Sequence, residues 1–357
     1  MTCRERIERQ MAGAPVDRLP VIGGWLTAAS QFQAFAECTE QEFWADPKGM
    51  ALRAYRNLGV DGMICLLLPT TPDDYRGGLT EETRRARREA YPTPESVLDY
   101  VRVLPEPEHV ADHFDSAAYY DEIVTSMQKD QAELGEFVHM PGRWDIDGSF
   151  MWYLTFGYES YLGALGQYPE EMRKLFEHSA EQSRLQNEVL ARVYTDHSFC
   201  KLMLMGQDIC GQTGPMVSPK WLEKVYFPLG KRAVQPLLNA GFRLIWHSDG
   251  HILPILDPIL DLGVAGFQGF QAETGTTVDI VARRKTIRGE PLMFLGGYSS
   301  TTTLVTGTPD DVRREIEHYL EITEGRLFLL STNTVNPDAK IENIRAAFNY
   351  AREHPFS

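Results

Sequence analysis

The sequence predicts an α/β fold, a single (β/α)8 TIM barrel, and three observations lead to it. Short, almost continuous apolar runs recur along the chain, which is typical of strands that are covered on both faces. Segments with helical spacing separate these runs. Eight such alternations in 357 residues suit one barrel domain that spans residues 1–357. A doubly wound parallel sheet is the alternative.

Eight segments have the length and the β-branched or aromatic content of strands, and turn residues flank each of them. In chain order they are residues 19–25, 62–68, 137–141, 199–205, 243–247, 264–268, 292–296 and 327–330.

Residues 169–194 form the clearest predicted helix, because proline and glutamate occupy its first turn and apolar residues follow at helical spacing. In residues 309–323, Thr308 is the expected N-cap. Residues 73–115 are rich in charge and proline and interrupt the alternation, so we expect an excursion or lid on one barrel rim. The remaining predicted helices are residues 47–58, 219–240 and 252–262.

Composition excludes several classes of function. A net charge of −15 opposes extended contact with nucleic acid. The charged N-terminus does not resemble a signal peptide and no apolar run reaches membrane-spanning length, so we expect a soluble, cytoplasmic protein. Five cysteines without CxxC spacing indicate reduced, mostly buried thiols. Dinucleotide and phosphate-loop glycine motifs are absent as well.

The most informative stretch is LIWHSDG, residues 244–250, where a strand ends in His247 and Asp249. Residues two apart on a strand point to the same side, and the carboxyl ends of barrel strands meet at one face. The polar and aromatic groups at the eight strand ends should therefore share a pocket. They are Trp25; Pro69 and Thr70; Arg143, Trp144 and Asp145; Gln207 and Asp208; His247, Asp249 and His251; Gln268, Gln271 and Glu273; Tyr298; and Ser331, Asn333 and Thr334.

His247 and Asp249 admit two chemical interpretations. With Glu273 they are candidate ligands of a divalent metal such as zinc. With Asp208 they are candidate catalytic groups, in which a carboxylate fixes the imidazole for acid–base work. The side chains around these groups suit a planar or carboxylated substrate, and we predict that they bind it. They are Trp25, Arg143, Trp144, Gln207, Gln271, Tyr298 and Asn333.

Structural roles compete with these assignments. His247 would then only cap backbone groups, Asp208 would form a buried salt bridge with Arg143, and Glu273 would start a turn. Tyr298 would pack in the core, and the aromatic stretch 150–156 would form a core or pocket wall.

Three stretches carry a family resemblance: GQDICGQTGPMVSPKWLEKVYFPLGKRAV, WHSDGHILPILDPILDLGVAGFQ and IENIRAAF. With VDRLPVIGG near the N-terminus, they resemble the uroporphyrinogen decarboxylase superfamily in order and over nearly the whole chain. The resemblance implies a TIM barrel. It also implies one of two chemistries, which are cofactor-free decarboxylation of a tetrapyrrole and methyl transfer involving a corrinoid.

Departures from the family patterns narrow this choice. Decarboxylases of the family carry an RQAGRY-type motif, whereas this chain reads GGWLTAASQFQ at that place. In the methyltransferases of the family that activate a thiol, an HxC pair and a later cysteine typically bind zinc. Here those positions correspond to His247, Asp249 and either Asn333 or Thr334, so oxygen replaces the thiolates. Harder ligands favour activation of an ether or phenol oxygen.

The first hypothesis is therefore a corrinoid-dependent methyltransferase of the O-demethylase type, with a corrinoid protein and a small methylated substrate as partners. The second is a decarboxylase of a small acid, in which Arg143 holds a carboxylate and Asp208 or His247 donates a proton. The third is a barrel that binds a ligand without turning it over. The oligomeric state is open, with a homodimer as one option.

Overall fold

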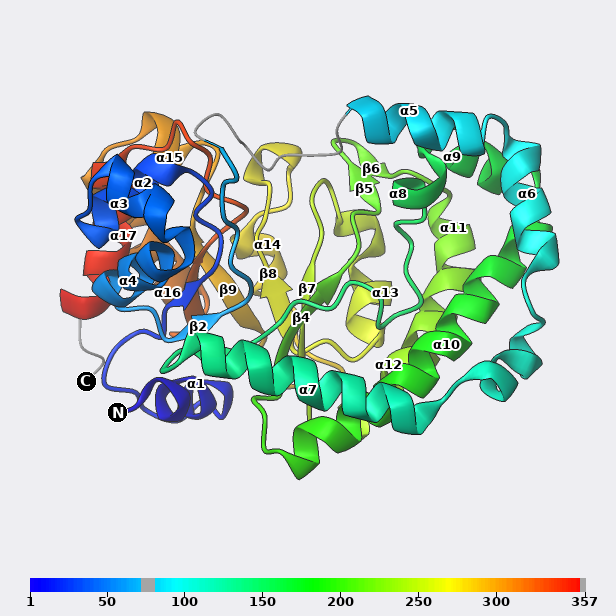
Figure 1. Cartoon of the computed structure of the whole chain (residues 1–357), viewed down its shortest axis with the longest axis horizontal. Coiled ribbons are helices and arrows are strands. Elements are labelled where there is room, and N and C mark those ends of the chain that lie inside the picture. Colours follow the sequence, from blue (N-terminus) through cyan, green and yellow to red (C-terminus); the bar gives the residue numbers. More distant parts are fainter. Residues whose placement is uncertain (72–80, 354–357) are drawn as a thin grey trace.

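A computed structural model describes residues 1–71 and 81–353 of the chain. Its central feature is a set of eight parallel strands that follow one another in chain order. Figure 1 shows β4, β7 and β8 in the middle of the molecule. They are β1 (Ile22–Gly23), β2 (Gly62–Met63), β3 (Val138–His139), β4 (Leu202–Gly206), β7 (Arg243–His247), β8 (Gly266–Gln268), β9 (Met293–Tyr298) and β10 (Leu327–Ser331). A small antiparallel hairpin, β5 (Cys210–Gly211) and β6 (Gly214–Pro215), follows β4.

The strands form two arcs, β1-β2-β3 and β4-β7-β8-β9-β10. A parallel bridge between Val21 and Leu329 joins β1 to β10. On the other side, a backbone hydrogen bond of 2.8 Å from Arg143 N to Leu204 O links the segment after β3 to β4. The order in which the strands neighbour one another is that of a TIM barrel, as predicted, although the backbone pairing is sparse between β3 and β4.

Two apolar layers line the strands, and alternate residues enter each of them. Leu202 and Leu204 belong to the inner cluster, with Ile245, Leu295 and Phe328. Met203 and Met205, which point the other way on β4, belong to the larger cluster beneath the surrounding helices. All five residues of β4 are buried, which explains why the strands read as continuous apolar runs.

Helices surround the strands. They are α1 (Cys3–Met11), α2 (Ala29–Ala36), α3 (Glu40–Ala45), α4 (Pro47–Leu58), α5 (Glu81–Ala90), α6 (Pro94–Val103), α7 (Ser116–Leu134), α8 (Tyr153–Phe156), α9 (Tyr158–Gln167), α10 (Pro169–Asp196), α11 (Pro219–Trp221), α12 (Phe227–Asn239), α13 (Leu256–Asp261), α14 (Val278–Val281), α15 (Thr303–Thr306), α16 (Pro309–Ile322) and α17 (Ile341–Glu353). Short 3-10 turns occur at η1 (Pro107–His113), η3 (Leu253–Ile255) and η4 (Ala272–Thr274), and η2 (Leu222–Tyr226) is a π-helical turn.

Local signals located several of these helices closely. The predicted helix 47–58 has the bounds of α4, and Asp46 caps its first turn by accepting from Gly49 N at 2.9 Å. The predicted helix 219–240 is instead divided by the π-helical turn η2. Pro228 has no N–H for the carbonyl four residues earlier, so the regular ladder is interrupted there.

The first three strands are shorter than predicted, with two residues each in place of five to seven. The chain leaves β1 at Gly24, which has a φ of +121°. A Cβ at Gly24 would lie 2.5 Å from Cys65 O, so only glycine allows this close approach to the segment after β2.

The predicted excursion is helical where the structure describes it. Within 73–115, α6 packs against α9 and α10, and α5 contacts α8. These helices gather at one side of the molecule, away from α2, α3 and α4 (Figure 1). Residues 73–80 lie outside the described residues, and a lid function for the segment stays a prediction.

A buried ion cluster lies at the amino end of β2, the face opposite to the strand tips. Asp61 is fully buried and accepts hydrogen bonds from Arg6 and Arg18, with Nη1 and Nη2 of Arg18 at 2.8 and 2.9 Å. Val21 N donates to it at 2.9 Å. Two guanidinium groups and a backbone amide thus satisfy one buried carboxylate, and the cluster ties α1 to the barrel.

Two sequence expectations concern the whole chain. Among the described residues, no helix combines the length and apolar character that a bilayer crossing requires. All five cysteines are free thiols, as predicted, but only Cys200 and Cys210 are buried. The other three are partly exposed, so the expectation of mostly buried thiols is wrong.

Candidate functional site

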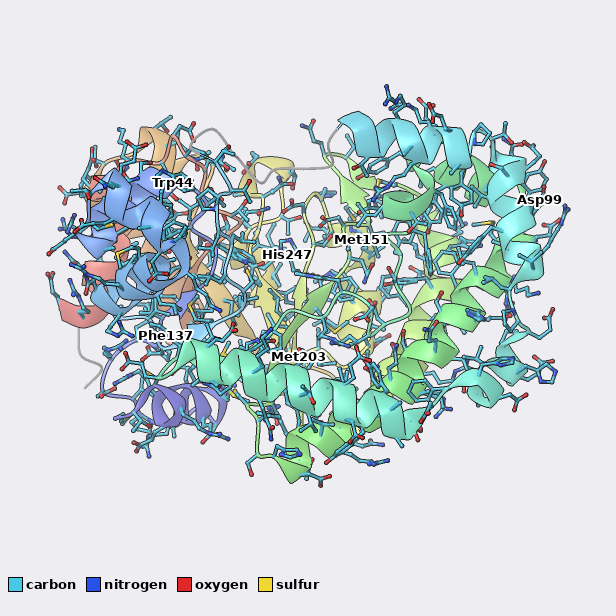
Figure 2. The ribbon with its side chains drawn as sticks, viewed as in Figure 1. Trp44, Asp99, Phe137, Met151, Met203 and His247 are labelled. Atoms are coloured by element: carbon cyan, nitrogen blue, oxygen red, sulfur yellow. The ribbon has the colours of Figure 1, made fainter. Side chains whose placement is uncertain are left out.

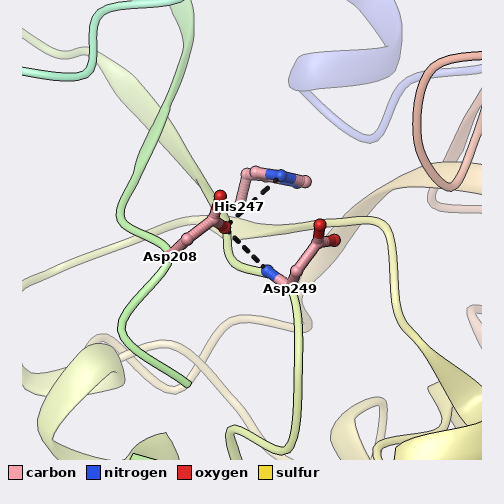
Figure 3. Close-up of side chains that lie close together, drawn as sticks. All are labelled: Asp208, His247 and Asp249. Carbon is pink, nitrogen blue, oxygen red and sulfur yellow. Dashed lines mark hydrogen bonds and ion pairs between the residues drawn. The ribbon is translucent and has the colours of Figure 1, made fainter. Parts of the chain in front are cut away.

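Three side chains meet where β4 and β7 end (Figure 3), and Figure 2 shows where one of them, His247, lies in the whole molecule. His247 is the last residue of β7, Asp249 lies two residues beyond it, and Asp208 lies two residues beyond β4. The parallel register sets Gly206 opposite His247, which brings the two loops together. The sequence expectation that His247 lies at a strand tip beside Asp249 agrees with this placement.

Gly206 permits this approach. Its φ is +132°, and a Cβ there would lie 1.9 Å from the carbonyl oxygen of His247. Any side chain at this position would push β4 away from β7, so a glycine is needed to hold the two strand ends in register.

Gln268 defines the tautomer of His247. Its side-chain amide donates to the carbonyl oxygens of Ser331 and Thr332, both at 3.0 Å, so its Oε1 must face the imidazole. Oε1 therefore accepts a hydrogen bond from Nδ1 of His247. In the neutral imidazole, this leaves Nε2 with a free lone pair, and Nε2 faces Asp208.

Asp249 has few partners for its charge. Both of its carboxylate oxygens accept from Nδ2 of Asn333 at 3.0 Å. Burial raises the pKa of Asp249, the nearby imidazole of His247 lowers it, and the neighbouring Asp208 carboxylate raises it. The net direction is upward, so a proton or a cation at this place would be favoured.

Asp208 faces both of the other groups. Its Oδ1 lies 3.9 Å from His247 Nε2 and accepts from Asp249 N at 3.0 Å. Its side chain is 42% exposed. The alternative of a buried salt bridge between Asp208 and Arg143 is wrong, because Arg143 turns instead toward Tyr119 and Asp145.

The three residues have the composition of a metal site. One ligand atom from each of Asp208, His247 and Asp249 lies within 4.8 Å of the others. Glu273, which the sequence suggested as the third ligand, is not part of this group. It is exposed in the turn η4, and Asp208 takes its place.

Two indoles flank the imidazole. The rings of Trp25 and Trp144 lie edge-on to His247, with centroids at 6.0 and 5.6 Å. Both were predicted to bind substrate, and both lie beside the candidate reactive group. Trp144 is partly exposed while Trp25 is buried, so Trp144 is the more accessible of the two.

Gln207 organises the loop after β3 and has little freedom to bind a ligand. Its Oε1 accepts from Phe150 N at 2.8 Å and Met151 N at 3.2 Å, and its Nε2 donates to Asp147 at 2.9 Å. Asp147 also accepts from the Tyr226 hydroxyl at 2.7 Å, and burial raises its pKa to about 6. Sequence reasoning missed Asp147, and nothing in the spacing of GRWDIDG distinguishes it from Asp145.

Three other residues that were predicted to bind substrate make contacts within the protein. Gln271 Oε1 accepts from Gly250 N at 2.7 Å, which shapes the loop after β7. Tyr298 is only 2% exposed and packs in the core. Asn333 holds Asp249, and its own Oδ1 accepts from Thr334 N.

The stretch 150–156, expected to be a wall, lines two cavities. One has a volume of about 580 Å³ and is bordered by Arg143, Trp144, Met151 and Trp152. The other, of about 610 Å³, lies between α5 and the α8–α9 region and is bordered by Tyr153 and Phe156. Neither lining includes Asp208, His247 or Asp249, but Trp144, whose ring lies beside His247, borders the smaller cavity.

Comparison with known proteins gives a family match. The family model described as uroporphyrinogen decarboxylase (URO-D) matches residues 2–354. No curated protein sequence matches significantly.

The comparison with solved structures finds a similar fold. A methyltransferase from Methanosarcina mazei has a TM-score of 0.66 and 13% sequence identity, and the match covers 99% of each chain. At this identity the likeness shows the fold alone. A protein described as a vitamin-B12 independent methionine synthase from Listeria monocytogenes has a TM-score of 0.41 and 16% identity, with 65% of this chain and 69% of that chain covered. That score is too low to indicate a shared fold.

Proposed function

The chain belongs to the uroporphyrinogen decarboxylase family, and within it we propose a methyltransferase that moves a methyl group from a small methoxylated aromatic substrate to a corrinoid protein. The observation that carries the proposal is the cluster of Asp208, His247 and Asp249 at the strand tips, where active sites of this fold lie. The lack of the RQAGRY-type motif and the methyltransferase name of the Methanosarcina mazei structure support it further.

The residues present fit a divalent metal. Gln268 leaves Nε2 of His247 as the lone-pair donor, and two carboxylates beside it supply oxygen. Burial raises the pKa of Asp249, and the neighbouring Asp208 carboxylate raises it further, so a cation at this place would be favoured. A metal held by these three residues would supply a Lewis acid that stabilises the oxygen released by the substrate.

A corrinoid partner would supply cobalt(I) as the nucleophile for the methyl carbon, and the electron pair of the breaking methyl–oxygen bond would stay on the oxygen. The protein stabilises this developing negative charge. Without a metal, a protonated His247 serves instead: Gln268 holds its Nδ1–H, and Nε2–H donates its proton to the oxygen. Asn333 keeps Asp249 oriented, and the indoles of Trp25 and Trp144 hold an aromatic ring near the imidazole.

Methyl transfer can be tested directly. The purified protein is mixed with a corrinoid protein reduced to cobalt(I) and a panel of methoxylated aromatics, and the absorbance of methylcobalamin is followed with the phenol product. We expect both products in equal amounts. A His247→Ala variant should be about 10²–10⁴-fold slower, the usual loss for an acid–base group. Folded protein that yields neither product across the panel would contradict the proposal.

Decarboxylation of a small acid is the second candidate, and the guanidinium of Arg143 at the edge of the 580 Å³ cavity favours it. In that reaction the bond to the carboxylate carbon breaks, carbon dioxide leaves, and the remaining carbanion takes a proton from Asp208 or His247. Release of carbon dioxide in the absence of cobalt would select this function over methyl transfer.

A further inference from the structure

Gln207 lies between the last residue of β4 and Asp208, and its buried side chain joins the loop after β3 to the candidate site. Its Nε2 donates to the carbonyl oxygen of Trp144 and to Oδ1 of Asp147. Its Oε1 accepts from the backbone N–H groups of residues 150 and 151. The donors and the acceptor of this amide are therefore all used within one loop.

Asp147 fixes the orientation of that amide. Its Oδ1 accepts from Gln207 Nε2 at 2.9 Å, and its Oδ2 accepts from the Tyr226 hydroxyl at 2.7 Å. A carboxylate accepts and cannot donate, so it requires the N–H side of the amide. In the opposite orientation, the amide oxygen would face the carboxylate, and its N–H groups would face those of residues 150 and 151. Asp147 thus orients Gln207 as Gln268 orients His247.

Tyr226 anchors Asp147 from the π-helical turn η2. Its ring is buried among those of Phe150, Phe176 and Phe227, with centroids at 5.9, 6.1 and 5.2 Å. This packing leaves the hydroxyl little freedom to move away from Asp147. π-helical turns within helices are frequent at functional sites.

The loop that Gln207 holds touches the candidate site at two points. It carries Trp144, whose ring centroid lies 5.6 Å from that of His247. The helix that follows it, α8, carries Tyr153, whose hydroxyl donates to the carbonyl oxygen of Asp208 at 3.0 Å. A displacement of this loop would therefore shift both an indole beside the imidazole and the backbone of a candidate metal ligand.

We propose that Asp147 is a positioning residue that acts on the candidate site through Gln207. The oriented amide of Gln207 holds the loop after β3 against the tip of β4, and this loop sets Trp144 beside His247. Asp147 is buried and borders neither of the two cavities, so it acts through other residues and not by contact with a substrate. Its effect on turnover rests on the proposed methyl transfer.

The first test removes the carboxylate and then restores its oxygen. In Asp147→Ala the Gln207 amide is free to turn, while Ser183 and Asn187 of α10 still donate to the carbonyl oxygens of residues 145 and 146 at 2.6 and 2.8 Å. The kcat of methyl transfer should fall by about 10–100-fold, the usual loss when a supporting partner of an active-site group is removed. Asp147→Asn should recover most of this loss, because its oxygen still accepts from Gln207.

The second test follows Trp144 without any substrate. Quenching of tryptophan fluorescence by acrylamide is compared between each protein and its Trp144→Phe counterpart, because the chain has six tryptophans. Trp144 is 36% exposed in the native protein. We expect it to become more accessible to acrylamide in Asp147→Ala and to resemble the wild type in Asp147→Asn.

A matched control separates positioning from general stability. Asn343 of α17 is also fully buried, and its amide donates to the carbonyl oxygens of residues 303, 304 and 307. Asn343→Ala should lower the melting temperature but leave kcat and the quenching of Trp144 unchanged. Tyr226→Phe removes only one hydrogen bond of Asp147, and it replaces Asp147→Ala if that variant does not fold. Circular dichroism shows which variants are folded.

The outcomes separate this proposal from the proposed function. Wild-type quenching of Trp144 in folded Asp147→Ala, or in Tyr226→Phe where Asp147→Ala does not fold, overturns the positioning role. An Asp147→Asn variant as impaired as Asp147→Ala overturns it too, as does an equal effect of Asn343→Ala. If Trp144 responds as expected but the wild type transfers no methyl group to cobalt(I), the positioning role is supported and the proposed function is overturned.

Discussion

Two shielded carboxylates lie at opposite ends of the barrel, and their surroundings differ sharply. Asp61, before β2, is surrounded by two guanidinium groups and a backbone N–H. Asp249, after β7, has one amide donor and a second carboxylate beside it. The first environment compensates a charge fully, whereas the second leaves negative charge in excess. The amino face of the barrel is thus built for stability, and the carboxyl face for binding a proton or cation.

The largest expected effect comes from removing the compensated acid. Asp61→Ala removes the counterion of Arg18 and leaves Arg6 with only the more exposed Asp17, so the free energy of unfolding should fall by about 3–5 kcal/mol. Urea denaturation followed by circular dichroism measures it. Arg18→Gln, which leaves Asp61 paired with Arg6, is the milder variant if Asp61→Ala does not fold. A loss below about 1 kcal/mol for both variants would break the comparison.

A smaller effect should follow from loosening the histidine on the other face. Gln268→Ala removes the acceptor that fixes Nδ1 of His247, so zinc affinity should fall by about 10–100-fold. Competition with a chromophoric chelator measures it in wild type and variant. Gln235→Ala, on the exposed surface of α12, is a matched glutamine control. Equal zinc affinities in all three proteins would contradict a metal site at His247.

The smallest effect should come from removing the uncompensated charge itself. Asp249→Asn keeps an oxygen for Asn333, so without metal its stability at neutral pH should equal or exceed that of the wild type by up to about 1 kcal/mol. Chemical denaturation in the presence of a chelator measures the difference.

The raised pKa of Asp249 fixes the sign of the pH dependence of this stability difference. Between the ordinary value near 3.9 and the raised folded value, the native protein binds more protons than the unfolded chain, so wild-type stability falls as pH rises through this window. The advantage of Asp249→Asn should therefore shrink as pH falls toward about 4. If Asp249→Asn is less stable than the wild type by the same amount at neutral pH and at about pH 4, the charge of Asp249 is compensated in the native protein.

Local patterns explain what the sequence predicted well. Helix α4 has an aspartate cap, a first-turn proline and a terminal glycine, all of which act within a few residues. The strand β7 is a continuous apolar run that ends at His247, so its predicted bounds agree with the structure. The pairing of His247 with Asp249 follows from the alternation of side chains along this strand.

Tertiary contacts explain what could not be predicted. Whether Asp208 meets Arg143 or His247 depends on the register of β4 against β7, which Gly206 permits. The role of Gln268 likewise depends on its place opposite His247 in the next strand pair. Glu273 follows β8 by only a few residues, but the turn η4 directs it toward solvent.

The hydrogen bond between Arg143 N and Leu204 O joins the two arcs of strands. Among the described residues it is the backbone link that closes the ring of strands between β3 and β4, and it belongs to the residue whose side chain borders the 580 Å³ cavity. An occupant of that cavity would therefore brace the junction of the two arcs. The exchange rate of the Arg143 amide proton with solvent deuterium reports on how tightly the ring is closed.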